Sequence, residues 1–466
     1  MSKLNRRNFI KSAAIASAGA ALTPGFLKAE EKTEPVKKSR LFKNKVNLAF
    51  IGVGLRGRNH VNNAAKRDDV FISAICDTDP DAIKRTQKLL KKNNCKEAKV
   101  YTGDDYAFMK LLEDKDIDAV VISTPWLWHT RMAVQAMKAG KYTGLEVSAA
   151  NTLEECWDLV NTYEETGSHC MLLENVCYAR EALAALKMVR EGVFGEVVHA
   201  TCGYRHDLRF VKFNDGKGPY GNGVEFGEKG FSEAKWRTQH SLLRNGDVYP
   251  THGIGPVATW FDINRGNRFV SMTARATKSV GLHDYIVNHP KGGKDHPNAK
   301  LKWKLGDIIT SVIKTAKEET IIVTHDTNLP RPYSWGFTLN GSKGVWNGQF
   351  EGKRIFIEGA GKGHNWLTDK KYDEYMKKYD HSLWVEEGKK AKGAGHGGID
   401  FFTMKSFIEG VKNERAPEID VYDAAAWSAI TPLSEASILN NSAPQDFPDF
   451  TRGRWINNKP IFGLEK

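Results

Sequence analysis

The sequence contains a glycine pattern typical of turns that bind a diphosphate, Gly52-Val53-Gly54-Leu55-Arg56-Gly57. It directly follows the apolar run Val46 to Ile51, and Asp77 ends the next apolar run, twenty residues beyond the last glycine. The first glycine suits a tight turn, the second lets the backbone approach the phosphates, and the third lets the next helix pack on the strand. Asp77 is placed to bind an adenosine ribose and to repel a 2′-phosphate. The pattern predicts an NAD site; Arg56 weakens the preference over NADP, and a glycine turn without ligand is the alternative.

A second group of residues could transfer protons. Histidine is the residue type best suited to exchange protons near neutral pH, so His252 is a candidate general acid or base, while Tyr249 and Tyr333 could donate hydrogen bonds or assist proton transfer. The residues alone leave simpler interpretations open, because His252 could cap a helix and the tyrosines could be half-buried sheet residues. The histidines lack the H-x-x-x-H spacing and the cysteines lack C-x-x-C spacing, so we expect no metal site.

The elements that must position these residues divide the chain into two parts. From residue 46 to residue 178, near-continuous apolar runs alternate with amphipathic stretches, which predicts a doubly wound parallel sheet covered on both faces, an α/β Rossmann domain. From residue 179 to residue 466, longer alternating runs predict an α+β domain with an open, mostly antiparallel sheet. Its predicted elements include a strand from Ser334 to Asn340 and one helix from Tyr422 to Leu439.

The first 45 residues have a different character. Residues 1–29 contain the pair Arg6-Arg7, a weakly apolar run and a small-residue cleavage site near Ala29, which together predict a twin-arginine signal peptide and a periplasmic location. The apolar run is too short to span a bilayer, so we expect no stable membrane insertion. Residues 30–45 are rich in Lys and Glu and predict a lead-in linker.

Size and charge limit the classes of function. A chain of 466 residues with 41% hydrophobic and 27% charged residues is long enough for two cores. The net charge is +12. Residues 1–29 carry five positive charges and no negative ones, so the rest of the chain has a net charge of +7. No arginine-rich stripe accompanies this charge, so we expect no nucleic-acid partner.

The first part of the chain resembles the glucose-fructose oxidoreductase and inositol dehydrogenase family. The likeness rests on the glycine motif, on Ser123-Thr124-Pro125, on His129, and on a short strand ending at Glu146. It implies that the second domain closes a sugar site against the nicotinamide of NAD. One departure stands out, because dehydrogenases of the family usually have Glu-Lys-Pro where this sequence has Glu146-Val147-Ser148.

Longer strings resemble a narrower group, glycoside hydrolase family 109, which is known for an NAD-dependent α-N-acetylgalactosaminidase. They are Trp126-Leu127-Trp128-His129, Leu145-Glu146-Val147, Glu174-Asn175-Val176-Cys177-Tyr178, Gly203 to Arg209, Arg244 to Gly253, and Arg331-Pro332-Tyr333-Ser334. Carried over residue by residue, the resemblance implies that NAD contacts Leu55, Arg56, Asp77, Trp126, Leu127, Trp128, His129, Glu146, Val147 and Asn175. It implies that the sugar contacts Tyr204, Arg237, Tyr249, Pro250, Thr251, His252 and Tyr333.

The resemblance also implies a reaction. A glycan with terminal α-N-acetylgalactosamine would be oxidised transiently at C3 by NAD, lose its C2 proton, eliminate the aglycone and add water. The alternatives are a periplasmic sugar oxidoreductase with tightly bound cofactor, which the missing lysine disfavours, and a non-catalytic sugar-binding protein. The family likeness further predicts a homodimer through the open sheet. Residues Phe210 to Glu233 resemble an insertion, interpreted as a mobile flap that alters specificity.

Overall fold

The computed structural model describes residues 45–361 and 363–464. The predicted signal peptide and nearly all of the predicted lead-in therefore lie outside the described residues. Among the described helices, none combines the length and the apolar character that a bilayer crossing requires.

The first sheet has six strands in the order β3-β2-β1-β4-β5-β6, and every pairing within it is parallel. The strands are β1 (Val46–Ile51), β2 (Val70–Cys76), β3 (Lys99–Tyr101), β4 (Ala119–Ile122), β5 (Tyr142–Leu145) and β6 (Cys170–Leu172). This order is that of a Rossmann fold, whose ligands bind at the carboxyl ends of the strands. The prediction of a doubly wound parallel sheet is confirmed.

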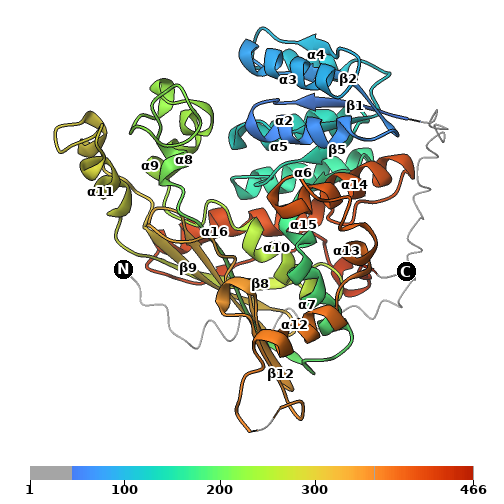
Figure 1. Cartoon of the computed structure of the whole chain (residues 1–466), viewed down its shortest axis with the longest axis vertical. Helices are drawn as coiled ribbons and strands as arrows, with labels where there is room; N and C mark the ends of the chain where they lie inside the picture. Colours follow the sequence, from blue (N-terminus) through green and yellow to red (C-terminus); the bar gives the residue numbers. More distant parts are fainter. Residues whose placement is uncertain (1–44, 362, 465–466) are drawn as a thin grey trace, which may run out of the picture. The chain divides into compact units, whose positions relative to one another are not determined.

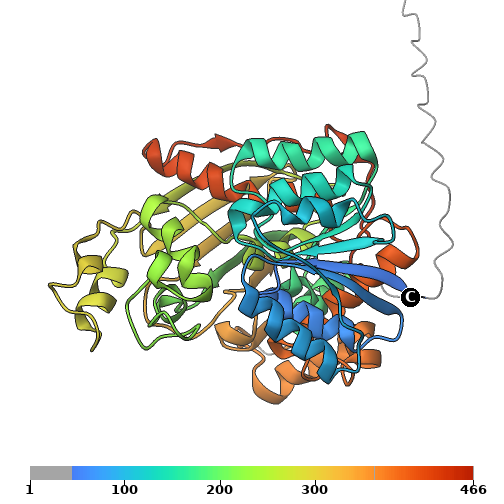
Figure 2. The ribbon, with the colours of Figure 1, turned by 90° about the horizontal axis from the view of Figure 1, so that it is seen from above.

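Helices lie against both faces of this sheet (Figure 2). They are α2 (Leu55–Ala65), α3 (Pro80–Lys92), α4 (Ala107–Leu112), α5 (Trp126–Lys138) and α6 (Leu153–Thr166). The chain becomes helical inside the glycine motif, with Gly54 as the N-cap of α2. The first turn of α2 is thus part of the phosphate-binding turn.

The second sheet has eight strands in the order β13-β12-β11-β7-β10-β9-β8-β14. Only β7 and β10 run parallel among these described pairs, so the prediction of a mostly antiparallel sheet is confirmed. The strands are β7 (Val197–Arg205), β8 (Phe269–Ala276), β9 (Ile308–Thr315), β10 (Thr320–Asp326), β11 (Thr338–Gly341), β12 (Gly344–Asn347), β13 (Arg354–Ile357) and β14 (Gln445–Asp446).

One face of this sheet is covered by helices (Figure 1). Helix α10 lies against β7 and β10, and α16 lies against β8. In β9 the inward Ile309, Ser311 and Ile313 are fully buried, whereas the alternate residues Thr310 and Val312 are exposed. The helices of this part are α7 (Arg180–Arg190), α8 (Arg209–Lys212), α9 (Arg237–Leu243), α10 (Thr251–Trp260), α11 (Gly281–Asn288), α12 (Asp369–Lys378), α13 (Ser382–Glu387), α14 (Ile399–Lys412), α15 (Val421–Ser428) and α16 (Ile430–Leu439).

Two predicted elements are broken in the structure. The strand predicted from Ser334 to Asn340 begins only at Thr338, because Gly336 has a φ of 64°, a left-handed conformation that ends strand pairing. The helix predicted from Tyr422 to Leu439 divides at Ala429. Pro432 lacks the N–H that would bond the carbonyl of Ser428, so a continuous helix is not available there.

The predicted insertion, residues 210–233, contributes to a small apolar core. It packs against residues 281–305, and the shared apolar side chains are Phe213, Val224, Leu282, Ile286, Ala299 and Trp303. The side chain of Asn298 also donates to the carbonyl of Val224 at 2.8 Å. The segment is therefore built onto the second domain by packing and hydrogen bonds.

Candidate active site

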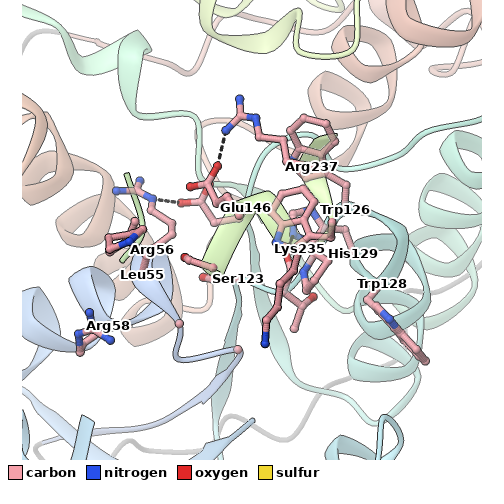
Figure 3. Close-up of a pocket in the computed structure, with 18 of the residues that line it drawn as sticks. Leu55, Arg56, Arg58, Ser123, Trp126, Trp128, His129, Glu146, Lys235 and Arg237 are labelled. Atoms are coloured by element: carbon pink, nitrogen blue, oxygen red, sulfur yellow. Dashed lines mark hydrogen bonds and ion pairs between the residues drawn. The ribbon is translucent and has the colours of Figure 1, made fainter. Parts of the chain in front are cut away.

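A cavity of about 790 Å³ lies where the carboxyl ends of the first sheet meet the second domain (Figure 3). Its wall on the Rossmann side comes from residues that follow the strands β1, β2, β4 and β5. Its opposite wall comes from β7, from the start of α10 and from residues 206–237. The size suits a dinucleotide together with a sugar.

Each glycine of the turn after β1 has a distinct steric reason. A Cβ on Gly52, whose φ is 83°, would lie 2.7 Å from the carbonyl oxygen of Ser123, and one on Gly57 would lie 1.9 Å from that of Gly52. A Cβ on Gly54 would meet no protein atom within 4 Å, and Gly54 lines the cavity. Gly52 and Gly57 thus allow close packing, and Gly54 leaves room for a diphosphate.

Buried polar atoms on the cavity wall also fit a dinucleotide. The hydroxyl oxygen of Ser123 and the side-chain oxygen Oδ1 of Asn175 have no hydrogen-bond partner among the described residues. Buried polar groups without partners are uncommon, so both atoms are suited to a bound ligand. Asp77 lies on the same wall, and its carboxylate accepts from the backbone N–H groups of Val53 (2.7 Å) and Asp79 (2.9 Å). Asp77 therefore also shapes the phosphate-binding turn.

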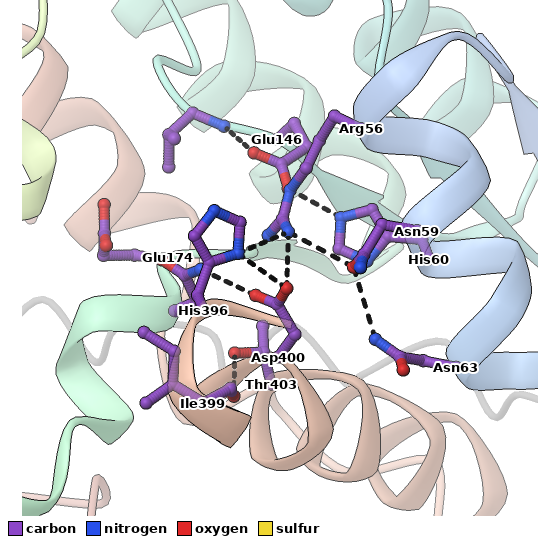
Figure 4. A network of polar contacts seen from close by, with 12 residues as sticks. Arg56, Asn59, His60, Asn63, Glu146, Glu174, His396, Ile399, Asp400 and Thr403 are labelled. Atoms are coloured by element: carbon purple, nitrogen blue, oxygen red, sulfur yellow. Dashed lines mark hydrogen bonds and ion pairs between the residues drawn. The ribbon is translucent and has the colours of Figure 1, made fainter. Parts of the chain in front are cut away.

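Arg56 and Glu146 belong to a charged network beside this turn (Figure 4). Nε of Arg56 donates to Glu146 at 2.5 Å, Nη1 of Arg56 donates to Asp400 at 2.8 Å, and Nε2 of His60 lies 2.6 Å from Glu146. Burial would raise the pKa of both carboxylates, but Arg56, together with His60 at Glu146 and His396 at Asp400, holds each pKa well below its usual range. The Nε and Nη1 atoms of Arg56 are thus bound to two carboxylates.

Residues 126–129, which follow β4, do not all line the cavity. Trp126, Trp128 and His129 line it, whereas Leu127 is 57% exposed and lies off its wall. Both ring nitrogens of His129 lie 2.7 Å from backbone carbonyls, those of Ser148 and Thr124. The His129 side chain thus holds the loop in place, and only the faces of its ring are left to contact a ligand.

His252 is held by a buried glutamate at the sugar end of the cavity. Its Nδ1 lies 2.8 and 2.9 Å from the two carboxylate oxygens of Glu174, which is fully buried. A carboxylate is an acceptor, so Nδ1 carries the hydrogen and Nε2 is left free to accept a proton. Two glycines of α10 allow the close approach that this contact requires. A Cβ on Gly253 would lie 2.6 Å from the backbone nitrogen of Gly203, and a Cβ on Gly255 would lie 3.1 Å from Cγ of Glu174.

Two tyrosines and an arginine surround this pair. The rings of Tyr204 and Tyr249 lie 5.2 and 4.9 Å from that of His252, and all three line the cavity. The guanidinium of Arg237 lies 5.0 Å from the Tyr249 ring and donates to Glu233 at 2.5 Å. Burial raises the pKa of both phenols, so they remain protonated hydrogen-bond donors at neutral pH.

The remaining predicted sugar contacts lie behind this wall. Pro250 and Thr251 are buried at the start of α10, and neither lines the cavity. Tyr333 also lies off the wall: its ring packs 4.7 Å from that of His206, and its hydroxyl accepts from Nε1 of Trp335. In this geometry Tyr333 supports His206 and Tyr204 from behind.

Sequence reasoning assigned no role to three polar residues that belong to the site. Glu174 follows β6 at the carboxyl edge of the parallel sheet, and that position is the signal that could have found it. His206 lines the cavity, and burial together with Arg237 lowers its pKa from 6.5 to about 4, so it is neutral at neutral pH. His396 lines the cavity as well, with Nδ1 2.7 Å from Asp400. No sequence spacing pointed to His396.

Comparison with known proteins is consistent with this geometry. Residues 46–173 match the family described as "Oxidoreductase family, NAD-binding Rossmann fold", and residues 178–457 match "Glycosyl hydrolase 109, C-terminal domain". The chain belongs to glycosyl hydrolase family 109. Family 109 thus combines an NAD-binding Rossmann domain with a second domain of its own type, as the resemblance in the sequence implied.

Similar family 109 sequences extend over the whole chain. A Tannerella forsythia protein named "Alpha-N-acetylgalactosaminidase" is 52% identical over 475 aligned residues, covering 98% of this chain and 99% of that protein. A "Glycosyl hydrolase family 109 protein" of Parabacteroides distasonis is 50% identical, again covering 98% and 99%. The chain is accordingly a glycoside hydrolase of this family.

Solved structures agree in fold. An NAD-binding oxidoreductase from Klebsiella pneumoniae superposes with a TM-score of 0.65 at 16% identity, over 87% of this chain and 100% of the other. A levoglucosan dehydrogenase in complex with NADH and L-sorbose gives 0.63 at 18% identity, with the same coverage. At these identities the likeness concerns the fold alone. Within the described residues, no three His, Cys, Asp or Glu side chains gather as metal ligands would.

Proposed function

We propose that this family 109 protein hydrolyses terminal α-N-acetylgalactosaminides and keeps NAD as a resident cofactor. The observation that carries the proposal is the His252–Glu174 pair, whose imidazole lines the same cavity as the dinucleotide turn. The name of the Tannerella forsythia relative supports the choice of sugar.

The residues of the turn and the adjoining wall are suited to hold the dinucleotide. Gly54 and Leu55 would offer backbone to its diphosphate and Asp77 would accept hydrogen bonds from its ribose, while Ser123 and Asn175 have unpartnered oxygens that would bond it. When bound, NAD supplies a reversible hydride acceptor for a carbon of the sugar.

The side chains of the protein then transfer protons and donate hydrogen bonds. A ketone at C3 of the sugar acidifies the proton on C2, and we assign Nε2 of His252 as the group that accepts it. Glu174 fixes the tautomer of the imidazole and stabilises the imidazolium that forms. Tyr204 and Tyr249 are placed to donate hydrogen bonds to sugar oxygens. Tyr333 acts through its packing against His206.

A direct assay tests this proposal. Purified protein should release nitrophenol from 4-nitrophenyl α-N-acetylgalactosaminide without any added hydride acceptor. Steady growth of the absorbance of reduced nicotinamide with free sugar would instead indicate a sugar oxidoreductase. A protein that contains NAD and shows neither activity would be a sugar-binding protein.

The sequence supports export to the periplasm by the twin-arginine route, because Arg6 and Arg7 precede a short apolar run. This route carries folded proteins, which suits a protein that takes up its dinucleotide before export. Replacing both arginines with lysine should leave the protein in the cytoplasmic fraction. Unchanged periplasmic recovery would contradict the assignment.

We also propose a homodimer through the open face of the second sheet. On β9 this face carries the exposed side chains of Thr310, Val312 and Lys314. Sedimentation should give twice the mass of the chain, and Val312→Glu should give monomers. A wild-type monomer would contradict this part of the proposal.

A further inference from the structure

An aromatic pair lies on the cavity wall outside the residues assigned to the terminal sugar. The rings of Phe210 and Tyr220 lie 5.7 Å apart, and both side chains line the cavity. They remain 39% and 47% exposed. Large aromatic side chains left exposed together on a cavity wall mark a contact surface for a ligand.

This pair continues the aromatic wall of the sugar site. The His206 ring lies 5.8 Å from that of Tyr204 and 6.3 Å from that of Phe210, so the rings form a path from the sugar end to Tyr220. Burial, and then the charge of Glu233, raises the pKa of Tyr220. Because Glu233 pairs with Arg237 of the sugar end, the aromatic pair adjoins that end of the cavity.

The segment that carries the pair is held in place. The backbone N–H of Gly221 donates to the carbonyl of Phe210 at 2.6 Å, and Asn214 exchanges backbone hydrogen bonds with Glu225 at 2.9 and 3.1 Å. The Asn214 side chain bonds both backbone groups of Phe231. The two rings are therefore preorganised, which lowers the entropy lost when a ligand binds.

We propose that Phe210 and Tyr220 form a second sugar subsite, which binds the pyranose that carries the terminal N-acetylgalactosamine. One face of a pyranose presents C–H groups with partial positive charge, and these complement the negative face of an aromatic ring. The Tyr220 hydroxyl and the ammonium of Lys217, also on the wall, are suited to bond its hydroxyl groups. This inference rests on the proposed function, since the bound pyranose is the leaving group of that hydrolysis.

Two substrates separate the subsite from the reaction. One is a disaccharide of α-N-acetylgalactosamine linked to galactose, and the other is α-N-acetylgalactosaminyl fluoride, whose leaving group cannot reach the pair. The double variant F210A/Y220A should lower kcat/KM for the disaccharide about tenfold or more, mainly through KM. For the fluoride, kcat/KM should change less than about twofold. The NAD content should equal that of wild type.

A second variant and a control keep the test independent of folding. F210L/Y220L retains apolar cover over the segment but lacks flat rings, and it should show the same selective loss. Phe71→Ala removes an equally exposed ring, 39%, that does not line the cavity, and it should leave both substrates unaffected. Equal losses on both substrates, no loss on the disaccharide, or loss of NAD from either double variant would overturn the subsite. Wild-type protein that cleaves neither substrate would overturn the proposed function, and the subsite with it.

Discussion

Two buried carboxylates hold side chains that line the same cavity, and these partners differ. Glu146, at the dinucleotide end, pairs with the guanidinium of Arg56, which keeps its proton at any physiological pH. Glu174, at the sugar end, pairs with the imidazole of His252, which can accept and release a proton. The ion pair at the dinucleotide end therefore keeps its charges, whereas the pair at the sugar end can transfer a proton. The assignment of chemistry to the sugar end follows from this difference.

The largest effect should come from His252. Replacing it with alanine should lower kcat by roughly two to four orders of magnitude, because a positioned acid or base contributes about that much. NAD content should change little, since the side chain lies at the sugar end of the cavity. Turnover of a glycoside and dinucleotide content after denaturation are the measurements.

A second histidine provides the control for this variant. His240 packs against Trp126 near the same end but does not line the cavity, so His240→Gln should retain most of the activity. If His252→Ala kept full activity, His252 would have no part in the chemistry. If both variants lost activity equally, the effect would be structural.

Glu174→Gln should have a smaller effect, roughly ten- to thousandfold on kcat. The amide can still accept from Nδ1 of His252, but it does not stabilise the imidazolium that forms on proton transfer. KM should stay near the wild-type value, because Glu174 is fully buried and contacts no substrate. A change confined to KM would contradict the role of Glu174 in positioning the imidazole.

At the other end, Arg56→Ala should affect stability and NAD retention more than chemistry. It leaves Glu146 and Asp400 buried without their main cation, which costs about 3 kcal/mol or more. With NAD saturating, kcat should fall less than about tenfold. Arg58, on the same helix and the same wall, has no carboxylate partner among the described residues, so Arg58→Ala should change stability by less than about 0.5 kcal/mol. Equal destabilisation by both variants would contradict the network.

The two ends should also differ in their response to acid. Burial, followed by a neighbouring arginine, lowers the pKa of His206 and of His240 from 6.5 to about 4. Their folded-state pKa values lie below the unfolded ones, so their contribution to stability is present above pH 6.5 and is lost as the pH falls towards 4. Glu146 and Asp400 should begin to cost stability only below the ordinary pKa values of carboxylic acids, 4.5 and 3.8. Melting temperature against pH should fall in two stages, and His240→Gln should flatten the first.

The sequence was most informative where the site is contiguous. The dinucleotide turn occupies six consecutive residues after a strand, so its fold and ligand could be predicted without tertiary information. The role of the Arg56 side chain could not be predicted in this way, because its partner Asp400 lies 344 residues away on α14. Arg56 also lines the cavity, and its contact with NAD stays a prediction.

The sugar end depends on packing that no local pattern reveals. Glu174 and His252 are 78 residues apart and meet because Gly253 and Gly255 let α10 approach both β7 and the segment after β6. Tyr333, Pro250 and Thr251 belong to matching strings, yet they lie behind the cavity wall. Likeness in sequence located the region of the site, and only the packing separated residues on the wall from those behind it.

In the proposed reaction, the sugar end of the cavity removes a proton from C2 of the substrate. Hydrolysis in deuterium oxide, followed by mass and proton spectra of the released sugar, tests it most directly. We expect deuterium at C2 of the N-acetylgalactosamine product, with the incorporation and the turnover both lost in His252→Ala. Product that carries no deuterium at C2, released at the normal rate, would contradict the account and favour direct displacement at C1.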